Sequence, residues 1–134
     1  KGGPNCTNWC LATGQPEYIG NTIMWIDEGI ASGKIIASDT VDIRNAANLS
    51  DIHIRVMNHA HDLCISAIKA VISNNNADGV NQNSIAKGKT YYTREWSLKQ
   101  KIALVKNTNS ILKTYNSRNF HSPDVEIITI NPNK

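Results

Sequence analysis

The sequence predicts a mainly α-helical protein in which a long helix and a second helix form an antiparallel helical hairpin. Two observations predict this fold class. Residues 39–73 contain neither Pro nor Gly, and their apolar side chains recur at three- and four-residue spacing, as in an amphipathic helix. Aromatic residues make up only 6% of the chain. Small aliphatic side chains must therefore fill the core, and helix-on-helix packing suits them.

The 134 residues are enough for one domain. Three parts are expected: an extended arm with turns over residues 1–32, a helical core over residues 33–120, and a short β element with a tail over residues 121–134. Gly and Pro recur through residues 1–22, which indicates an irregular arm, with Trp9 and Leu11 as apolar anchors. The apolar run at residues 23–26 suits a strand or a packed extended segment.

The long helix is predicted to begin at Ser38 or Asp39, because either side chain can cap a first turn. Asp39 and Asp42 also have the spacing of a capping box. The helix then covers roughly 35 residues, or on the order of 50 Å. An Asn-rich turn at residues 74–79 ends it. This turn has part of the spacing of a calcium loop, but Ile85 stands where the bidentate Glu should be, so a helix-stopping turn is the preferred interpretation.

Apolar residues of the long helix form one main stripe, while Ile54 and Ile65 lie off it. A helix that is apolar on more than one side is either deeply buried or shared between subunits. We expect it to be shared, with Arg44 paired to an acidic neighbour. The predicted intersubunit seam consists of Ile43, Leu49, Ile52, Val56 and Leu63.

A second helix is predicted from about Thr93 to residues 116–119. Its apolar register is set by Leu98, Ile102, Val105, Leu112 and Tyr115. Near the end of the chain, residues 125–130 alternate and are rich in β-branched side chains. They predict a strand bounded by Pro123 and Pro132.

Charge and hydropathy argue against two classes of partner. The net charge is +3, with acidic and basic residues interleaved and no basic run, so a nucleic-acid partner is unlikely. No apolar stretch approaches the ~20 residues that span a bilayer, so no membrane partner is expected. The sequence starts at Lys1 without an initiator Met, which indicates a processed product or a piece of a longer protein.

Four residues have the chemistry of a zinc site: Cys6, Cys10, His61 and Cys64. The two pairs are far apart in sequence, and the preferred interpretation makes Cys64 a small core residue and His61 a polar interface residue. His59 and His61 lie about 200° apart on a helix, so they cannot bind one metal together. We therefore expect no metal, no cofactor and no catalytic residues.

Two further sets of residues admit other roles. Trp25, Tyr91, Tyr92 and Trp96 could form a sugar-binding platform, although anchoring in a core or interface is the commoner role of such rings. His53, Asn58 and His61 are polar residues of the long helix that could set the register of an oligomer. A histidine at such an interface would make assembly depend on pH between about 5 and 7.

Residues 33–48 carry a glycine turn followed by a pattern that resembles one in bacteriophage tail, baseplate and fibre proteins. Val41 and Ala47 depart from it, where the pattern has Asn and Ile. The matching residues are Ile35, Ala37, Asp39, Ile43, Arg44, Ala46 and Asn48.

The resemblance implies a virion structural or connector protein that forms homo-oligomers and has no catalytic residues to carry over. We therefore predict a non-enzymatic assembly subunit, located in the virion or outside the cell. Its expected partners are further copies of itself and other virion structural proteins. Two alternatives stay open: a small secreted hydrolase or toxin domain with a Cys/His metal or thiol site, and a surface carbohydrate-binding adhesion module.

Overall fold

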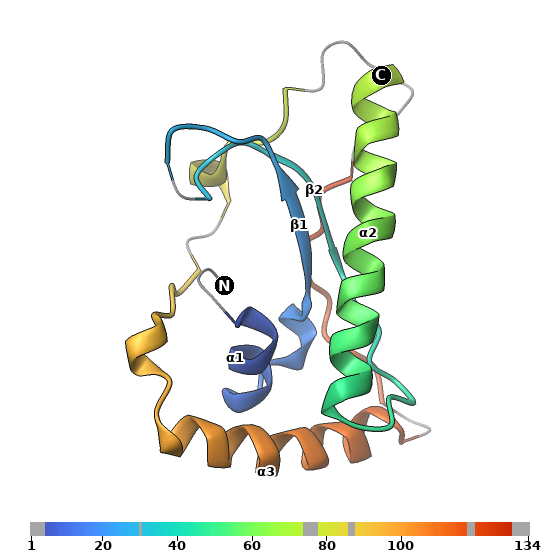
Figure 1. Ribbon diagram of the computed structural model, residues 1–134. Helices are drawn as coiled ribbons and strands as arrows, with labels where there is room; N and C mark the ends of the chain where they lie inside the picture. Colours follow the sequence, from blue (N-terminus) through green and yellow to red (C-terminus); the bar gives the residue numbers. More distant parts are fainter. Residues whose placement is uncertain (1–4, 30, 74–77, 86–87, 118–119, 130–134) are drawn as a thin grey trace.

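The computed structural model describes residues 5–29, 31–73, 78–85, 88–117 and 120–129. Within them, a two-stranded antiparallel sheet lies beside the long helix α2, and α3 runs across the end of the molecule where α2 begins (Figure 1). The helix α1 lies between the sheet and α3. The α-helices and strands are α1 (Cys6–Ala12), β1 (Gly20–Met24), β2 (Ile35–Thr40), α2 (Leu49–Ser73) and α3 (Leu98–Tyr115). Three short 3-10 turns are η1 (Pro16–Tyr18), η2 (Gln82–Ser84) and η3 (Thr93–Glu95).

The antiparallel sheet occupies the sequence in which the long helix was predicted to start. β1 pairs with β2 from Gly20 opposite Thr40 to Met24 opposite Ile35. Gly33 is buried where the hairpin closes. This position requires glycine, because a Cβ there would lie 1.7 Å from the carbonyl oxygen of Trp25. The prediction of a strand or extended segment at residues 23–26 is thus confirmed over its first half. The predicted helix start at Ser38 or Asp39 is wrong.

The reason lies in the side chains of β2 and in its pairing. Ile35, Ile36 and Thr40 are β-branched and favour a strand. Pairing with β1 provides hydrogen-bond partners for the backbone along one edge of β2. Ile36 and Ala37 are both buried, so both faces of the strand are covered. At its other edge, β2 bonds to Val80 through Ile35 and to Ile128 through Ser38. Burial and pairing outweigh the capping signal of Asp39.

α2 begins at Leu49, ten residues later than Asp39. Asn48 Oδ1 accepts the amide of Asp51 at 3.0 Å, and Asp51 Oδ2 accepts the amide of Ala47 at 2.9 Å. This exchange resembles a capping box: it satisfies the Asp51 amide in the first turn and the Ala47 amide just before the helix. The described part of the helix reaches Ser73. The Asn-rich turn and the calcium-loop residues Asn74 and Asn76 fall at residues 74–77, outside the described residues.

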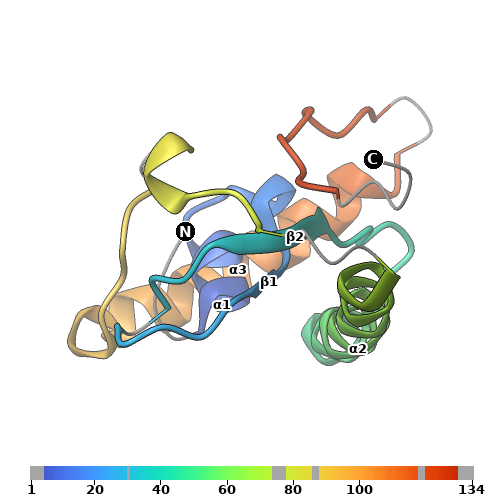
Figure 2. The same ribbon diagram turned by 90° about the horizontal axis from the view of Figure 1, so that it is seen from above.

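The predicted helical hairpin is wrong, because α2 and α3 pack against different partners. α2 packs against β1 and β2, while α3 packs against α1. Figure 2 shows α2 to one side of the strands, while α3 passes behind them. α1 was not predicted; it replaces part of the irregular arm and buries Trp9, Cys10 and Leu11. The described fold is therefore mixed α/β, with its strands in the N-terminal half.

The core has two parts. The larger joins α1, the loop after β2, α2 and α3, and it contains Cys10, Leu11, Ile19, Ile43, Ala46, Ile52, Leu104, Leu112 and Tyr115. The smaller lies between β2 and α2, around Ile36, Ala37 and Ala67. Of the predicted apolar register of α3, Leu112 and Tyr115 are buried, but Leu98, Ile102 and Val105 are exposed. Among the described residues of the predicted C-terminal strand, only Ile128 forms a β-bridge.

Candidate functional site

The face of α2 that points away from the sheet carries a line of apolar side chains. Its members follow one another at three or four residues, which places them on one face of the helix. The large apolar members have exposed fractions between 52% and 74%. With the exposed His61 in the middle, this outer stripe consists of Ile54, Met57, His61, Ile65, Ile68 and Ile72.

The opposite face of α2 belongs to the core. Ile52 and Ala67 are buried there, and Val56 and Leu63 are half-buried against the two core clusters. At about 100° per residue, these side chains lie on the far side of the helix from Ile54 and Ile65. Helix α2 therefore has two apolar faces. One packs against the rest of the chain, and the other is exposed on the surface.

The predicted seam residues lie mostly on the inner side. Ile43 is 1% exposed and Ile52 is fully buried, and both belong to the core of the chain itself. Leu49 and Val56 pack against the same cluster, and Leu63 packs against the smaller one. The face available to a partner is the outer stripe, which the sequence pattern marked only through Ile54 and Ile65.

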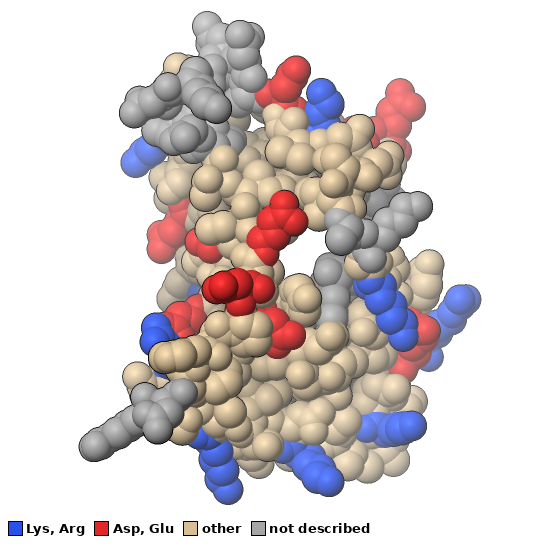
Figure 3. All heavy atoms as spheres, turned by 180° about the vertical axis from the view of Figure 1, so that it is seen from behind, with Lys and Arg blue, Asp and Glu red and all other residues tan. Residues whose placement is uncertain are grey.

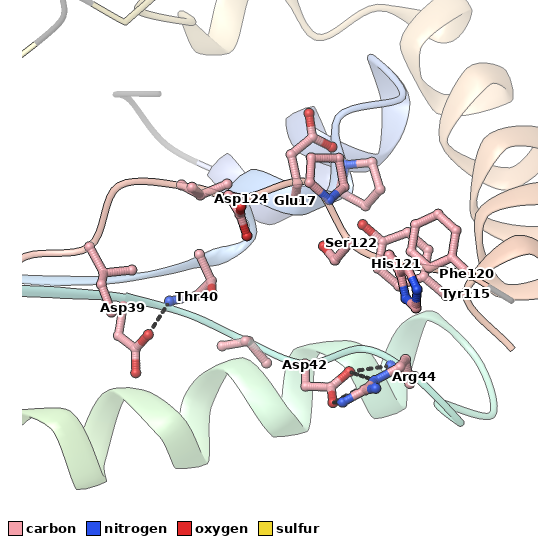
Figure 4. Close-up of a pocket in the computed structure, with 15 residues that line it drawn as sticks. Glu17, Asp39, Thr40, Asp42, Arg44, Tyr115, Phe120, His121, Ser122 and Asp124 are labelled. Carbon is pink, nitrogen blue, oxygen red and sulfur yellow. Dashed lines mark hydrogen bonds and ion pairs between the residues drawn. The ribbon is translucent and has the colours of Figure 1, made fainter. Parts of the chain in front are cut away.

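A cleft of about 550 Å³ opens on another part of the surface, between the β2–α2 connection and residues 120–127. Figure 4 shows Asp42 and Arg44 paired on the side of the connection, with the rings of Tyr115, Phe120 and His121 grouped at one end. Four carboxylates line the cleft, from Glu17, Asp39, Asp42 and Asp124. Figure 3 shows acidic side chains over the middle of the face seen there, above Lys and Arg at its lower edge.

Two of these carboxylates are held by neighbours in the chain. Asp42 accepts a hydrogen bond from Arg44 Nε at 2.8 Å and another from the Arg44 amide at 2.9 Å. The side-chain hydrogen bond from Arg44 is the main cause that lowers the pKa of Asp42 below its ordinary value. The expectation that Arg44 pairs with an acidic neighbour is confirmed. The pair fixes the connection that leads into α2.

Asp39 instead contacts His59 of α2, and the register of the sheet explains this contact. Asn21 and Asp39 are partners across β1 and β2, and both side chains reach His59 on α2. Asn21 Nδ2 lies 2.9 Å from His59 Nδ1 and also donates to the carbonyl of Val56. With the amide in this orientation, Nδ1 accepts and Nε2 donates to Asp39 Oδ2 at 3.2 Å. These bonds fasten the sheet to α2.

Tyr115, the last residue of α3, lines one end of the cleft. Burial is the main cause that raises the pKa of Tyr115, and the neighbouring Ser122 hydroxyl acts in the opposite direction. Within the described residues, the buried hydroxyl makes no hydrogen bond of good geometry. The ring packs against Phe120, with centroids 4.3 Å apart. The contacts of Asp39, Asp42 and Tyr115 therefore serve mainly to hold the chain together around the cleft.

The four zinc candidates do not come together. Cys6 and Cys10 lie on α1, where Cys10 is buried in the core, while His61 and Cys64 lie on α2. His61 belongs to the outer stripe. In the part of the chain that the structure describes, no three His, Cys, Asp or Glu side chains are arranged to hold a metal ion.

The other candidate residues are also placed. Tyr91 stacks on Trp9 with centroids 4.3 Å apart, and Trp96 meets Trp9 edge-on at 4.9 Å, so these two rings anchor α1. Trp25 and Tyr92 are exposed. Of the three polar residues of the long helix, His53 bonds to Asn8 of α1 at 2.9 Å. Asn58 is exposed beside the outer stripe.

Comparison with known proteins adds no relative. No family model, curated protein or solved structure matches this chain. Of the described helices, none is long and apolar enough to cross a membrane.

Proposed function

We propose that this protein is a non-enzymatic structural subunit that acts by self-association, with the outer stripe of α2 as its contact surface. The observation that carries the proposal is the row of five large apolar side chains, each more than half exposed, on one face of a 25-residue helix. Scattered apolar residues are normal on a protein surface, but contiguous rows mark interaction sites. A second copy presents the same row and can cover it.

The size of the stripe indicates what kind of contact it makes. Burying the exposed half of an Ile or Met side chain contributes about 1 kcal/mol. A symmetric pair buries ten such side chains, which gives on the order of 10 kcal/mol. This is comparable to the roughly 4–15 kcal/mol that association costs. The stripe alone therefore supports a weak pair, and firm assembly requires further contacts or many linked copies.

We extend the proposal to a component of a virion, such as a tail, baseplate or fibre. The resemblance of residues 33–48 to phage proteins supports this part. The weak contact through the outer stripe supports it as well, because many linked copies in a particle would make such a contact firm. On this proposal the partners are other copies and other virion structural proteins, and the location is the virion or the extracellular space. In this chain the segment forms β2 and the connection into α2.

Sedimentation equilibrium over a range of protein concentrations tests self-association. We expect the average mass to rise with concentration for the native chain. Ile65→Asp or Ile68→Asp should shift it to the monomer, because each places a charge in the stripe without removing a core contact. Ser66→Asp is the matched control, since Ser66 is exposed on the same helix but outside the stripe. A monomer at every concentration, or equal association of Ile65→Asp and the native chain, would contradict the proposal.

A further inference from the structure

The two edges of the outer stripe differ in charge. One edge carries Asp62 and Lys69, which are both exposed and lie seven residues apart, on nearly the same side of the helix. Neither has an ion-pair partner among the described residues. Over residues 57–72, the other edge is formed by the half-buried Ala60, Cys64 and Val71 and carries no charge.

From this asymmetry we infer that two copies pair through α2 in antiparallel orientation, with Asp62 of each copy opposite the partner's Lys69. The inference rests on the proposed self-association and adds its geometry. A two-fold axis can relate two facing helices in either orientation. In an antiparallel pair, each edge of one helix faces the same edge of its partner. Parallel helices meet unlike edges instead.

Edge matching decides between the two orientations. In a parallel pair, Asp62 and Lys69 would lie against the apolar edge of the partner and would lose water without gaining a partner. In an antiparallel pair, the charged edges meet each other and the apolar edges extend the buried surface. Opposite charges on facing helix edges set orientation in this way in coiled coils.

The positions of the two charges also set the register. Asp62 and Lys69 lie at almost equal distances before and after Ile65, so opposing them places the two-fold axis near Ile65. The Ile65 side chains of the two copies then meet at the centre. Ile68 lies beside the partner's His61, and Ile72 lies beside the partner's Met57. The apolar row from Met57 to Ile72 and the charges are thus satisfied by one arrangement.

Charge exchange tests this geometry in the full chain, with dissociation constants measured by sedimentation at low ionic strength. Asp62→Lys alone and Lys69→Asp alone each place two like-charged pairs across the interface. Each should weaken self-association by roughly five- to tenfold. An equimolar mixture of the two variants should recover the native affinity, because the heterodimer restores both opposite-charge pairs. The double variant Asp62→Lys/Lys69→Asp should also recover it.

Lys99→Asp is the matched control, because it changes the net charge as Lys69→Asp does but lies on α3. It should leave the dissociation constant unchanged. If the single variants associate as well as the native chain, or if neither the mixture nor the double variant recovers affinity, the antiparallel geometry is overturned while self-association stands. A native chain that stays monomeric overturns the proposed function itself, and this geometry with it.

Discussion

Thr108 and Tyr115 illustrate at the residue scale how the fold tolerates polar atoms in its core. Both lie on the inner face of α3, and their buried hydroxyl oxygens make no hydrogen bond of good geometry among the described residues. A buried hydroxyl that lacks a partner costs free energy, whereas one that is bonded is close to neutral. Thr108 was not a predicted core residue, because the predicted apolar register placed Ile102 and Val105 on the inner face instead.

Replacing the Thr108 hydroxyl with a methyl group should therefore not destabilise the protein. Thr108→Val keeps the shape of the side chain and removes the unpartnered oxygen, so we expect the free energy of unfolding to stay equal or rise by about 1 kcal/mol. Urea denaturation measures it. In the control Thr114→Val, the exposed hydroxyl that donates to the carbonyl of Ser110 at 3.1 Å is lost, and no gain is expected. A loss of more than about 1 kcal/mol in Thr108→Val would show that its hydroxyl is bonded.

At the scale of the element, α2 depends on how its first turn is held. Asp51 accepts the amide of Ala47 and pairs with Arg55, whose Nη1 in turn donates to the carbonyl of Arg44 at 2.7 Å. The backbone hydrogen bond from Ala47 is the largest cause that lowers the pKa of Asp51, followed by the hydrogen bond from Arg55. These contacts join the start of the helix to the connection from β2.

The lowered pKa of Asp51 predicts a dependence of stability on pH. Because this pKa is lower in the folded state than in the unfolded chain, the stabilisation is fully present above the ordinary aspartate value of about 3.9. It is lost as the pH falls through the folded value. Asp51→Asn should show a smaller fall in Tm than the native chain between pH 5 and pH 3. Glu28→Gln, at an exposed position between β1 and β2 and away from the outer stripe, is the control and should lose stability as the native chain does.

The two faces of α2 give a second prediction at this scale. Ile52 is fully buried and Ile54 is 58% exposed, although they are two residues apart. Ile52→Ala should lower the free energy of unfolding by about 2–5 kcal/mol, because it leaves a cavity in the core. Ile54→Ala should lower it by less than about 1 kcal/mol. Urea denaturation at low protein concentration compares them, and equal losses would show that the outer stripe is part of the monomer's core.

For the whole molecule, self-association and stability are linked. Any contact made only by folded chains stabilises the folded state by mass action. We expect the Tm of the native chain to rise with protein concentration in scanning calorimetry. The Tm of Ile65→Asp should not change over the same range. A native Tm that is independent of concentration up to the millimolar range would show that folded copies do not associate.

Several features of this architecture follow from local pattern and were predicted. Helix over residues 49–73, helix over residues 98–115 and the extended residues 23–24 belong to this group. So does the second apolar side of the long helix, seen in Ile54 and Ile65. Helical periodicity and turn residues act over a few positions, so they can be recognised in one sequence.

Other features depend on contacts between residues far apart in the sequence, so the local pattern could not predict them. Residues 35–40 carry both a capping signal and β-branched side chains, and pairing with β1 selected the strand, so that Asn48 and not Asp39 caps α2. Packing on the sheet placed Ile52 inside and left Ile65 outside. The cleft likewise required Asp42 and Tyr115 to meet across the fold. Helical periodicity alone predicts two apolar faces on α2, but the packing of the chain selects the face that a second copy can reach.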